Sequence, residues 1–202
     1  MSAQPQPRLT PEQYLEIERV AEVKSEYYNG RMYAMSGGSH RHVIVIGNFA
    51  FALRSALRKR PTCLVTTSDL RVRVAQAGLY SYPDVVVVCA EPKYADDRQD
   101  TLLNPLLIVE VLSPTTEAYD RGFKSAQYRT LESLEEYALV SQSEARVEVF
   151  RRQPGGWLLN ESVGLEAVCR LESVGADIAL ADIYDKLTFG SVETIASPPS
   201  SS

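Results

Sequence analysis

The chain has 202 residues, a length that fits one folded domain and is enough to bury a sizeable hydrophobic core. Its composition, with 45% hydrophobic and 23% charged residues, is that of an ordinary globular protein, and its formal net charge is -5. This charge excludes binding to nucleic acid through overall basicity, and no apolar run approaches the roughly 18 residues that a membrane span needs.

The first third of the chain predicts a helix followed by a hairpin. A helix is expected to begin near residue 10, because Thr10 fits the N-cap and Pro11 fits the first helical position. The stretch "EYYNGRMYAM" (26–35) then predicts a β-hairpin, since Asn29 and Gly30 supply the two positive φ angles of a type I′ turn.

A second helix and three strands are expected next. Ser39 is the candidate N-cap of this helix, and Pro61 stops it. The three strands are "DLRVRV" (69–74), "YSYPDVVVVC" (80–89) and "LLIVEVL" (106–112). The alternation in the first indicates a half-buried strand, whereas the valine run in the second suggests burial on both faces.

The last part of the chain predicts one more helix and a run of strands. The helix is "AYDRGFKSAQYRTLES" (118–133), with Asp120 as the expected cap, and the strands are "YALV", "RVEVFRR" and "GGWLLNESV". This order predicts an α+β protein with a mixed central sheet and an N-terminal helix plus hairpin. We expect a single domain over residues 1–202, with flexible tails at about 1–8 and 196–202.

The cysteines and the N-terminus bear on the compartment. Cys63, Cys89 and Cys169 are odd in number and have no metal-ligand spacing, which predicts free thiols in a reducing environment. The N-terminus "MSAQPQPRLT" has no apolar signal region. Together these features predict a cytoplasmic protein.

One acid lies in each of two predicted strands. Asp84 precedes "VVVV", and Glu110 lies inside the apolar run "LLIVEVL", where an unpaired charge would be costly. If the two strands are neighbours in the sheet, the two carboxylates lie close together and repel each other unless one is protonated or a cation lies between them. Oxygen ligands of this kind suit Mg²⁺ or Mn²⁺.

A lysine follows on the next predicted helix. Lys124, Gln127, Tyr128 and Leu131 share one face by helical spacing, and the apolar members of that face would turn Lys124 inward. Lys124 is therefore the candidate for stabilising the charge on an attacked phosphate.

The segments "YPDVVVV" and "LLIVEVLSPTTEAYDRGFKSAQYRTLESLEEYALV" resemble the family known as "Uma-type putative restriction endonuclease", which belongs to the PD-(D/E)xK nuclease superfamily. "VKSEYYNGRMYAMSGGSHRHVIVIGNFAFAL" and "ADIALADIYDKL" are similar to other parts of that family, so the likeness spans about residues 10–186. The resemblance implies a restriction-endonuclease-like α-β-β-β-α-β core and metal-dependent hydrolysis of phosphodiester bonds.

Carried over by position, the resemblance implies that Asp84 and Glu110 are the motif acids, which are catalytic and bind the metal. The superfamily motif has a lysine two residues after the glutamate, where this chain has Leu112, so the resemblance is to members in which Lys124 on the following helix serves instead. Glu26 and His42 lie where the family keeps polar residues, and they are expected to be accessory to the site. Gln127, on the same helix face as Lys124, is a further accessory candidate that could contact phosphate or substrate.

Other interpretations of these residues stay open at this stage. Glu110 could pair with Arg71 or Arg73 across the sheet, Asp84 could be an ordinary turn residue, and Lys124 could be a solvated helix lysine. The same two arginines are the candidates for substrate binding. The expected function is a Mg²⁺- or Mn²⁺-dependent DNA endonuclease acting as a homodimer, with RNA left open as a substrate, and the alternative is a non-catalytic module that binds nucleic acid or a partner.

Overall fold

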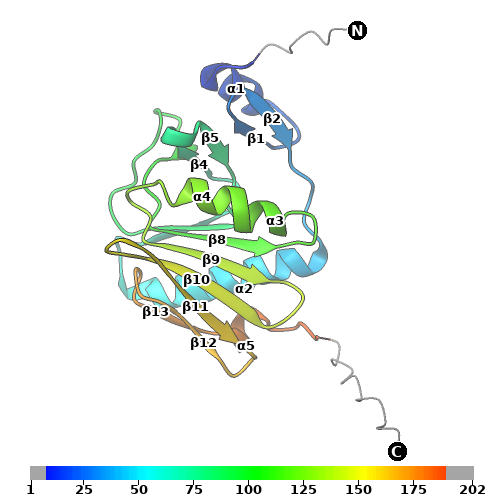
Figure 1. Ribbon diagram of the computed structural model, residues 1–202, viewed down its shortest axis with the longest axis vertical. Coiled ribbons are helices and arrows are strands. Elements are labelled where there is room, and N and C mark those ends of the chain that lie inside the picture. The colour runs from blue at the N-terminus through cyan, green and yellow to red at the C-terminus, as the bar shows by residue number, and fades with distance from the viewer. Residues whose placement is uncertain (1–7, 190–202) are drawn as a thin grey trace, which may run out of the picture.

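The computed structural model describes residues 8–189 and shows a mixed α+β fold built from two larger sheets and a two-stranded ribbon (Figure 1). The fold class predicted from the order of elements is therefore confirmed. Except for Arg8, the tails predicted at 1–8 and 196–202 lie outside the described residues. Within those residues, no helix is both long and apolar enough to cross a lipid bilayer.

The larger sheet has six strands in the order β11-β10-β9-β8-β6-β3. In chain order these strands are β3 (Leu64–Thr67), β6 (Val85–Val88), β8 (Leu107–Leu112), β9 (Glu136–Ser141), β10 (Arg146–Gln153) and β11 (Gly156–Val163). The pair β8 and β9 is parallel, and the other neighbours in this sheet are antiparallel. The sheet is mixed, as the order of elements predicts.

The smaller sheet has five strands in the order β2-β1-β5-β4-β7. These strands are β1 (Ser25–Tyr28), β2 (Arg31–Ala34), β4 (Arg71–Val74), β5 (Leu79–Ser81) and β7 (Thr101–Leu102). The first two form the predicted hairpin, in which Asn29 and Gly30 have φ angles of 45° and 89°. A separate ribbon pairs β12 (Val168–Leu171) with β13 (Ala176–Ala179).

Helices cover both faces of the larger sheet. The helical segments are α1 (Pro11–Glu18), α2 (His40–Ala56), a 3₁₀ turn (Leu57–Lys59), a second 3₁₀ turn (Ala75–Ala77), α3 (Glu117–Tyr119), a π turn (Asp120–Lys124), α4 (Ser125–Tyr128) and α5 (Leu180–Ile183). Both predicted N-caps are confirmed, because the side chains of Thr10 and Ser39 accept hydrogen bonds from the first turns of α1 and α2. In Figure 1 the helix formed by α3, the π turn and α4 runs between the two sheets.

Alternation along β8 divides the core into two layers. Val109 and Val111 point toward the cluster that includes Phe49 and Leu53 of α2, whereas Ile108 and Leu112 belong to the cluster on the other face. Because side chains alternate along a strand, Glu110 points to the same face as Ile108 and Leu112, and the helix between the sheets covers that face.

Three sequence predictions about the elements are wrong in detail. The stretch 80–89 is not one strand, because the chain leaves the smaller sheet after β5 and enters the larger sheet at β6. The strand β3 was not predicted, and it is the first strand of the larger sheet in chain order. The predicted strand 69–74 lies in the smaller sheet instead. Asp120 does not cap the third helix but lies buried inside it, because that helix already begins at Glu117.

The prediction of three free thiols is also wrong. Cys63 and Cys89 form a disulfide, and only Cys169 is free among the described cysteines. The pairing follows from the antiparallel β3–β6 register, in which Leu64 lies opposite Val88. Cys63 immediately precedes Leu64 and Cys89 immediately follows Val88, so the same register places the two cysteines opposite each other. A separation of 26 residues in sequence contains no sign of this register. The argument for a reducing compartment from unpaired thiols therefore does not hold.

Candidate active site

Asp84 and Glu110 lie on neighbouring strands. Val85 of β6 pairs with Val109 of the antiparallel β8, so the same register places Asp84 opposite Glu110. Asp84 immediately precedes β6, in the short segment where the chain crosses from one sheet to the other. The two acids therefore lie side by side, as the sequence predicts if these strands are adjacent, and the structure places them where the two sheets meet.

Glu110 is buried, with only 3% of its surface exposed. Its Oε1 accepts hydrogen bonds from the Tyr128 hydroxyl at 2.9 Å and from Lys124 Nζ at 3.1 Å. Burial raises the pKa of Glu110 well above its ordinary value, and the Lys124 ammonium opposes that rise. No arginine contributes to these contacts, so the glutamate is paired with the helix lysine rather than with Arg71 or Arg73.

Lys124 lies at the centre of three carboxylates. Its Nζ is 2.9 Å from Glu26 Oε1, 3.1 Å from Glu110 Oε1 and 3.4 Å from Asp120 Oδ1. Burial alone would lower the pKa of this lysine, but the carboxylates of Glu110, Glu26 and Asp120 outweigh it and raise the pKa well above the ordinary value. Lys124 is therefore a protonated, buried cation at neutral pH.

The helix that carries Lys124 is locally widened. Residues 120–124 form a π turn between two short α-helical segments, and such turns often occur at functional sites. Asp120 and Lys124 are both buried, and their side chains form an i, i+4 ion pair. The predicted inward face of this helix is thus occupied by Lys124 and Tyr128, as the spacing suggests, but Asp120 also belongs to it.

His42 and a backbone amide hold Asp84. The imidazole Nε2 of His42 is 3.3 Å from Asp84 Oδ1, and the amide of Val111 donates a hydrogen bond of 2.7 Å to Oδ2. The hydrogen bond with Asp84 raises the pKa of His42, against the effect of burial. His42 follows the Ser39 cap of α2, so the start of that helix brings the imidazole to the carboxylate.

A pocket of about 360 Å³ opens at these residues and is called here the carboxylate pocket. Its functional lining consists of His42, Asp84, Glu110, Asp120 and Lys124. Loop residues 35–39, between β2 and α2, and 113–116, between β8 and α3, form most of the remaining wall, together with Tyr82, Val111 and Gln142.

The structure does not bring every candidate to this pocket. Gln127 is half-buried on the helix but is not part of the pocket lining. Arg71 is buried and is held by Asp100, Thr101 and Tyr82, so it is not available at the surface. Arg73 lies over the ring of Tyr80 in the smaller sheet.

Asp120 is the site residue that the sequence analysis missed as a member of the group. Its position four residues before Lys124 was a usable signal, because side chains at i and i+4 share a helix face. The prediction that Asp120 caps the helix assigned this residue a different role. Glu26, predicted only as an accessory residue, lies in direct contact with Lys124 from the hairpin strand β1.

The carboxylates of the site are the kind of oxygen ligands that a divalent cation needs. Three carboxylates surround Lys124, and Asp84 lines the same pocket. Asp120 Oδ1 is buried and makes no hydrogen bond, and its ion-pair contact is the Lys124 ammonium at 3.4 Å. Among residues 8–189 no three metal-binding side chains form a ready ligand cluster, because Lys124 lies between three of the acids. Carboxylate oxygens and an excess of negative charge are nevertheless the kind of environment that Mg²⁺ or Mn²⁺ prefers, so the residues present fit such an ion.

Comparisons with known proteins show the family to which the chain belongs. Residues 11–181 match the Uma2 family, which is described as "Putative restriction endonuclease". Two proteins of Synechocystis sp. are similar: slr1290 is 37% identical over 190 residues, covering 92% of this chain and 96% of that protein, and sll1609 is 36% identical over 160 residues, covering 79% and 90%. Both are described as uncharacterized.

A solved structure shares the fold. It is described as "a putative nuclease belonging to DUF820" from Anabaena variabilis, with a TM-score of 0.70 and 16% identity, and the match covers 87% of this chain and 97% of that one. At this identity the likeness concerns the fold alone. The match to the family extends over most of the chain, and this protein is therefore a member of the Uma2 family.

Proposed function

We propose that this protein is a Mg²⁺- or Mn²⁺-dependent endonuclease that hydrolyses phosphodiester bonds in DNA. The observation that carries the proposal is the gathering of Asp84, Glu110 and Lys124 in one pocket, from two neighbouring strands and the following helix. Membership of a family described as restriction endonucleases supports the reaction class.

Each residue has a defined part in the proposed site. Asp84 and Glu110 would hold the divalent cation, which when bound lowers the pKa of a water ligand and stabilises charge on a phosphate oxygen. Lys124 supplies a fixed positive charge beside Glu110, and its three carboxylate contacts hold the ammonium in place. His42 orients Asp84 through the 3.3 Å contact to Oδ1, and the Val111 amide holds Oδ2, so that the carboxylate is fixed in the lining of the pocket.

Substrate binding depends on the metal more than on arginine. Because Arg71 is buried, it no longer serves as a candidate contact to phosphate. Three acids line the carboxylate pocket, and Glu26 adds a fourth through its contact with Lys124. The basic residues of the lining are Lys124 and His42. A divalent cation would offset this negative charge and allow a phosphate to approach.

Binding of the metal can be measured without any substrate. We expect Mn²⁺ to raise the melting temperature of the wild type, by an amount equivalent to about 2.7 kcal/mol at 100 times its dissociation constant. Asp84→Asn should lose this shift, because the amide keeps an acceptor for the Val111 amide but removes the charge. Asp97→Asn is the matched control, since Asp97 is exposed in a loop.

Cleavage tests the reaction itself. Incubation with circular plasmid DNA and Mg²⁺ should produce nicked and linear forms, which only an endonuclease can generate from a closed circle. Asp84→Asn should produce neither form, and Asp97→Asn should cut like the wild type. A homodimer, expected because cutting both strands favours two sites, is measured separately by sedimentation.

The outcomes separate the proposal from its alternative. Stabilisation by Mn²⁺ without cleavage of DNA or RNA would identify a non-catalytic binding module on the nuclease fold. Cleavage that persists in chelator, or in Asp84→Asn, would overturn the metal-dependent mechanism. Cleavage of RNA alone would replace the proposed substrate.

A further inference from the structure

A second and larger pocket, of about 570 Å³, lies beside the carboxylate pocket and is called here the aromatic pocket. Four rings form its lining: Tyr28, Tyr33, Tyr119 and Phe123. Two of these come from the β1–β2 hairpin and two from the helix between the sheets. Figure 1 shows the hairpin above the α3 end of that helix, with the connection to α2 passing beside both.

Three of the four rings contact one another. Tyr119 and Phe123 stack with centroids 5.2 Å apart and ring planes inclined by 14°, and Tyr28 meets Phe123 edge-on at 4.6 Å. Tyr33 lies opposite Glu26 in the hairpin register and is 48% exposed. Because cross-strand partners project from the same face of a sheet, Tyr33 lies on the face of the hairpin that bears Glu26.

The two pockets share part of their lining. Met35, Ser36, Thr116 and Lys124 line both of them, so the lysine at the centre of the carboxylates also forms part of the aromatic wall. Lys124 Nζ lies 5.6 Å from the centroid of the Tyr119 ring, and the Tyr119 hydroxyl donates to Glu26 at 3.4 Å. A ligand that lies against these shared residues can therefore contact both pockets.

Charge and shape restrict what this ligand can be. Among the described residues that line the two pockets, only Lys124 and His42 are basic, and both are already engaged by carboxylates. A rigid duplex held mainly through its phosphates needs several lysines or arginines near the site. The aromatic pocket instead suits a flat ring with two apolar faces, and a nucleotide joins such a ring to a phosphate.

We propose that the aromatic pocket receives an unpaired nucleobase of the strand that is cut, so that the preferred substrate is DNA with single-stranded or readily extruded nucleotides. This inference rests on the proposed function and adds its substrate class. A base inside a duplex is stacked on both sides and must leave the helix before aromatic side chains can stack on it. Stacking on protein rings depends little on base identity, so we expect weak sequence preference at this position.

The test uses the full chain and a fluorescein-labelled single-stranded DNA oligonucleotide, with its blunt duplex as the comparison, in Ca²⁺ and without Mg²⁺. Fluorescence anisotropy should show that the single strand binds at least about 10-fold more tightly than the duplex. Tyr33→Ala should weaken single-strand binding by about 5- to 150-fold, the range for losing one base–aromatic stack. Tyr33→Phe keeps the ring and should bind like the wild type.

Two further measurements guard against unfolding and nonspecific effects. Phe51→Ala is the matched control, because Phe51 is an aromatic residue that is 73% exposed on α2 and lines a different pocket. A 2-aminopurine base in the oligonucleotide reports stacking directly, and its fluorescence should be quenched by the wild type and by Phe51→Ala. Quenching should be reduced with Tyr33→Ala.

The results distinguish this inference from the proposed function. Stacking and single-strand preference without cleavage in Mg²⁺ would support the aromatic pocket and overturn the nuclease. Cleavage of intact duplex as fast as of the single strand, unchanged in Tyr33→Ala, would overturn the pocket and leave the nuclease. Absence of oligonucleotide binding would also overturn the inference. A dimer in solution that Tyr33→Ala dissociates would overturn it too, because the aromatic pocket would then be occupied by a second copy of the chain.

Discussion

Replacement of Lys124 by methionine tests the charge balance at the centre of the site. Lys124→Met keeps much of the side-chain volume but leaves the carboxylates of Glu26, Glu110 and Asp120 without their shared cation. At about 3 Å and an effective dielectric constant of about 20, each contact corresponds to an attraction of roughly 5 kcal/mol. Most of that attraction is offset by the cost of burying the charges, and loss of one partner from a buried group costs about 3–5 kcal/mol.

The expected loss of 3–5 kcal/mol is measured as a change in the free energy of unfolding. Urea denaturation in the presence of a chelator, followed by circular dichroism, gives this value from the midpoint and slope. Lys59→Met is the matched control, because Lys59 is exposed in the 3₁₀ turn after α2. Its substitution should change stability by less than about 0.5 kcal/mol.

A loss below about 1 kcal/mol in Lys124→Met would refute this reasoning. It would mean that the three acids are protonated or hydrated in the folded protein and do not depend on the ammonium. The same variant should also lose plasmid cleavage in buffer without urea, under conditions in which it is fully folded. A folded variant that cuts at the wild-type rate would remove Lys124 from the proposed mechanism.

Three other changes probe the scaffold around the site. The hydrogen bond from Arg19 lowers the pKa of Asp100, so this carboxylate stabilises the fold above about pH 4 and the contribution is lost at lower pH. Asp100→Asn should therefore cost about 1–3 kcal/mol at pH 7 and less as the pH falls below about 4, as measured by urea denaturation across pH. Reduction of the Cys63–Cys89 disulfide should lower the free energy of unfolding by about 3 kcal/mol, and an unchanged urea midpoint in dithiothreitol would contradict this. Tyr128→Phe should cost about 1–2 kcal/mol, because the buried hydroxyl bridges Ser81 and the site glutamate, and equal midpoints would show that the bridge contributes nothing.

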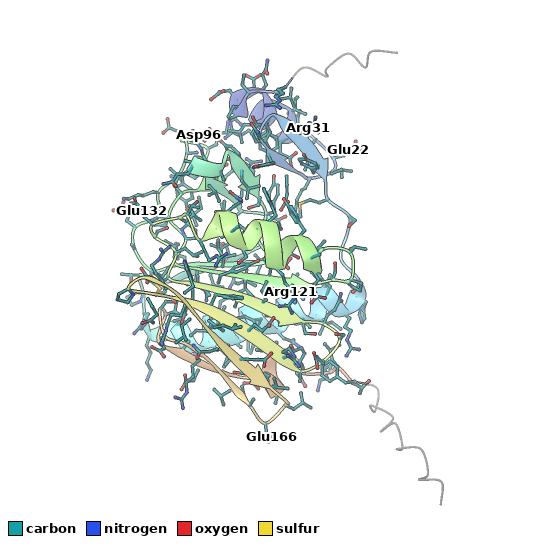
Figure 2. All side chains as sticks on the ribbon, in the orientation of Figure 1. Glu22, Arg31, Asp96, Arg121, Glu132 and Glu166 are labelled. Atoms are coloured by element: carbon teal, nitrogen blue, oxygen red, sulfur yellow. A yellow bond between two sulfur atoms is a disulfide. The ribbon has the colours of Figure 1, made fainter. Side chains whose placement is uncertain are left out.

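An arginine on the surface of the helix between the sheets has one partner that is local in sequence and one that depends on tertiary structure. Figure 2 shows Arg121 at the helix, on the side of the strands of the larger sheet, and this arginine pairs with Glu117 and Glu148. Glu117 lies four residues away on the same helix and could be predicted from spacing. Glu148 lies on β10 and becomes a partner only when the helix docks on the sheet.

The sequence alone determined the features that depend on a few consecutive residues. The caps at Thr10 and Ser39 and the turn at Asn29 and Gly30 are examples, because their hydrogen bonds and backbone angles are satisfied locally. The apolar runs around Asp84 and Glu110 predicted buried strands for a similar reason. The inward position of Lys124 followed from helical spacing with Tyr128 and Leu131.

Tertiary structure alone decided which distant segments meet. Glu26 reaches Lys124 only because the hairpin of the smaller sheet docks against the helix, and Cys63 meets Cys89 only through the β3–β6 register. The break between β5 and β6 placed Asp84 at the junction of two sheets, which no periodicity of a valine run can indicate. These contacts join residues far apart in sequence, so their energies depend on the packing of whole elements rather than on local pattern.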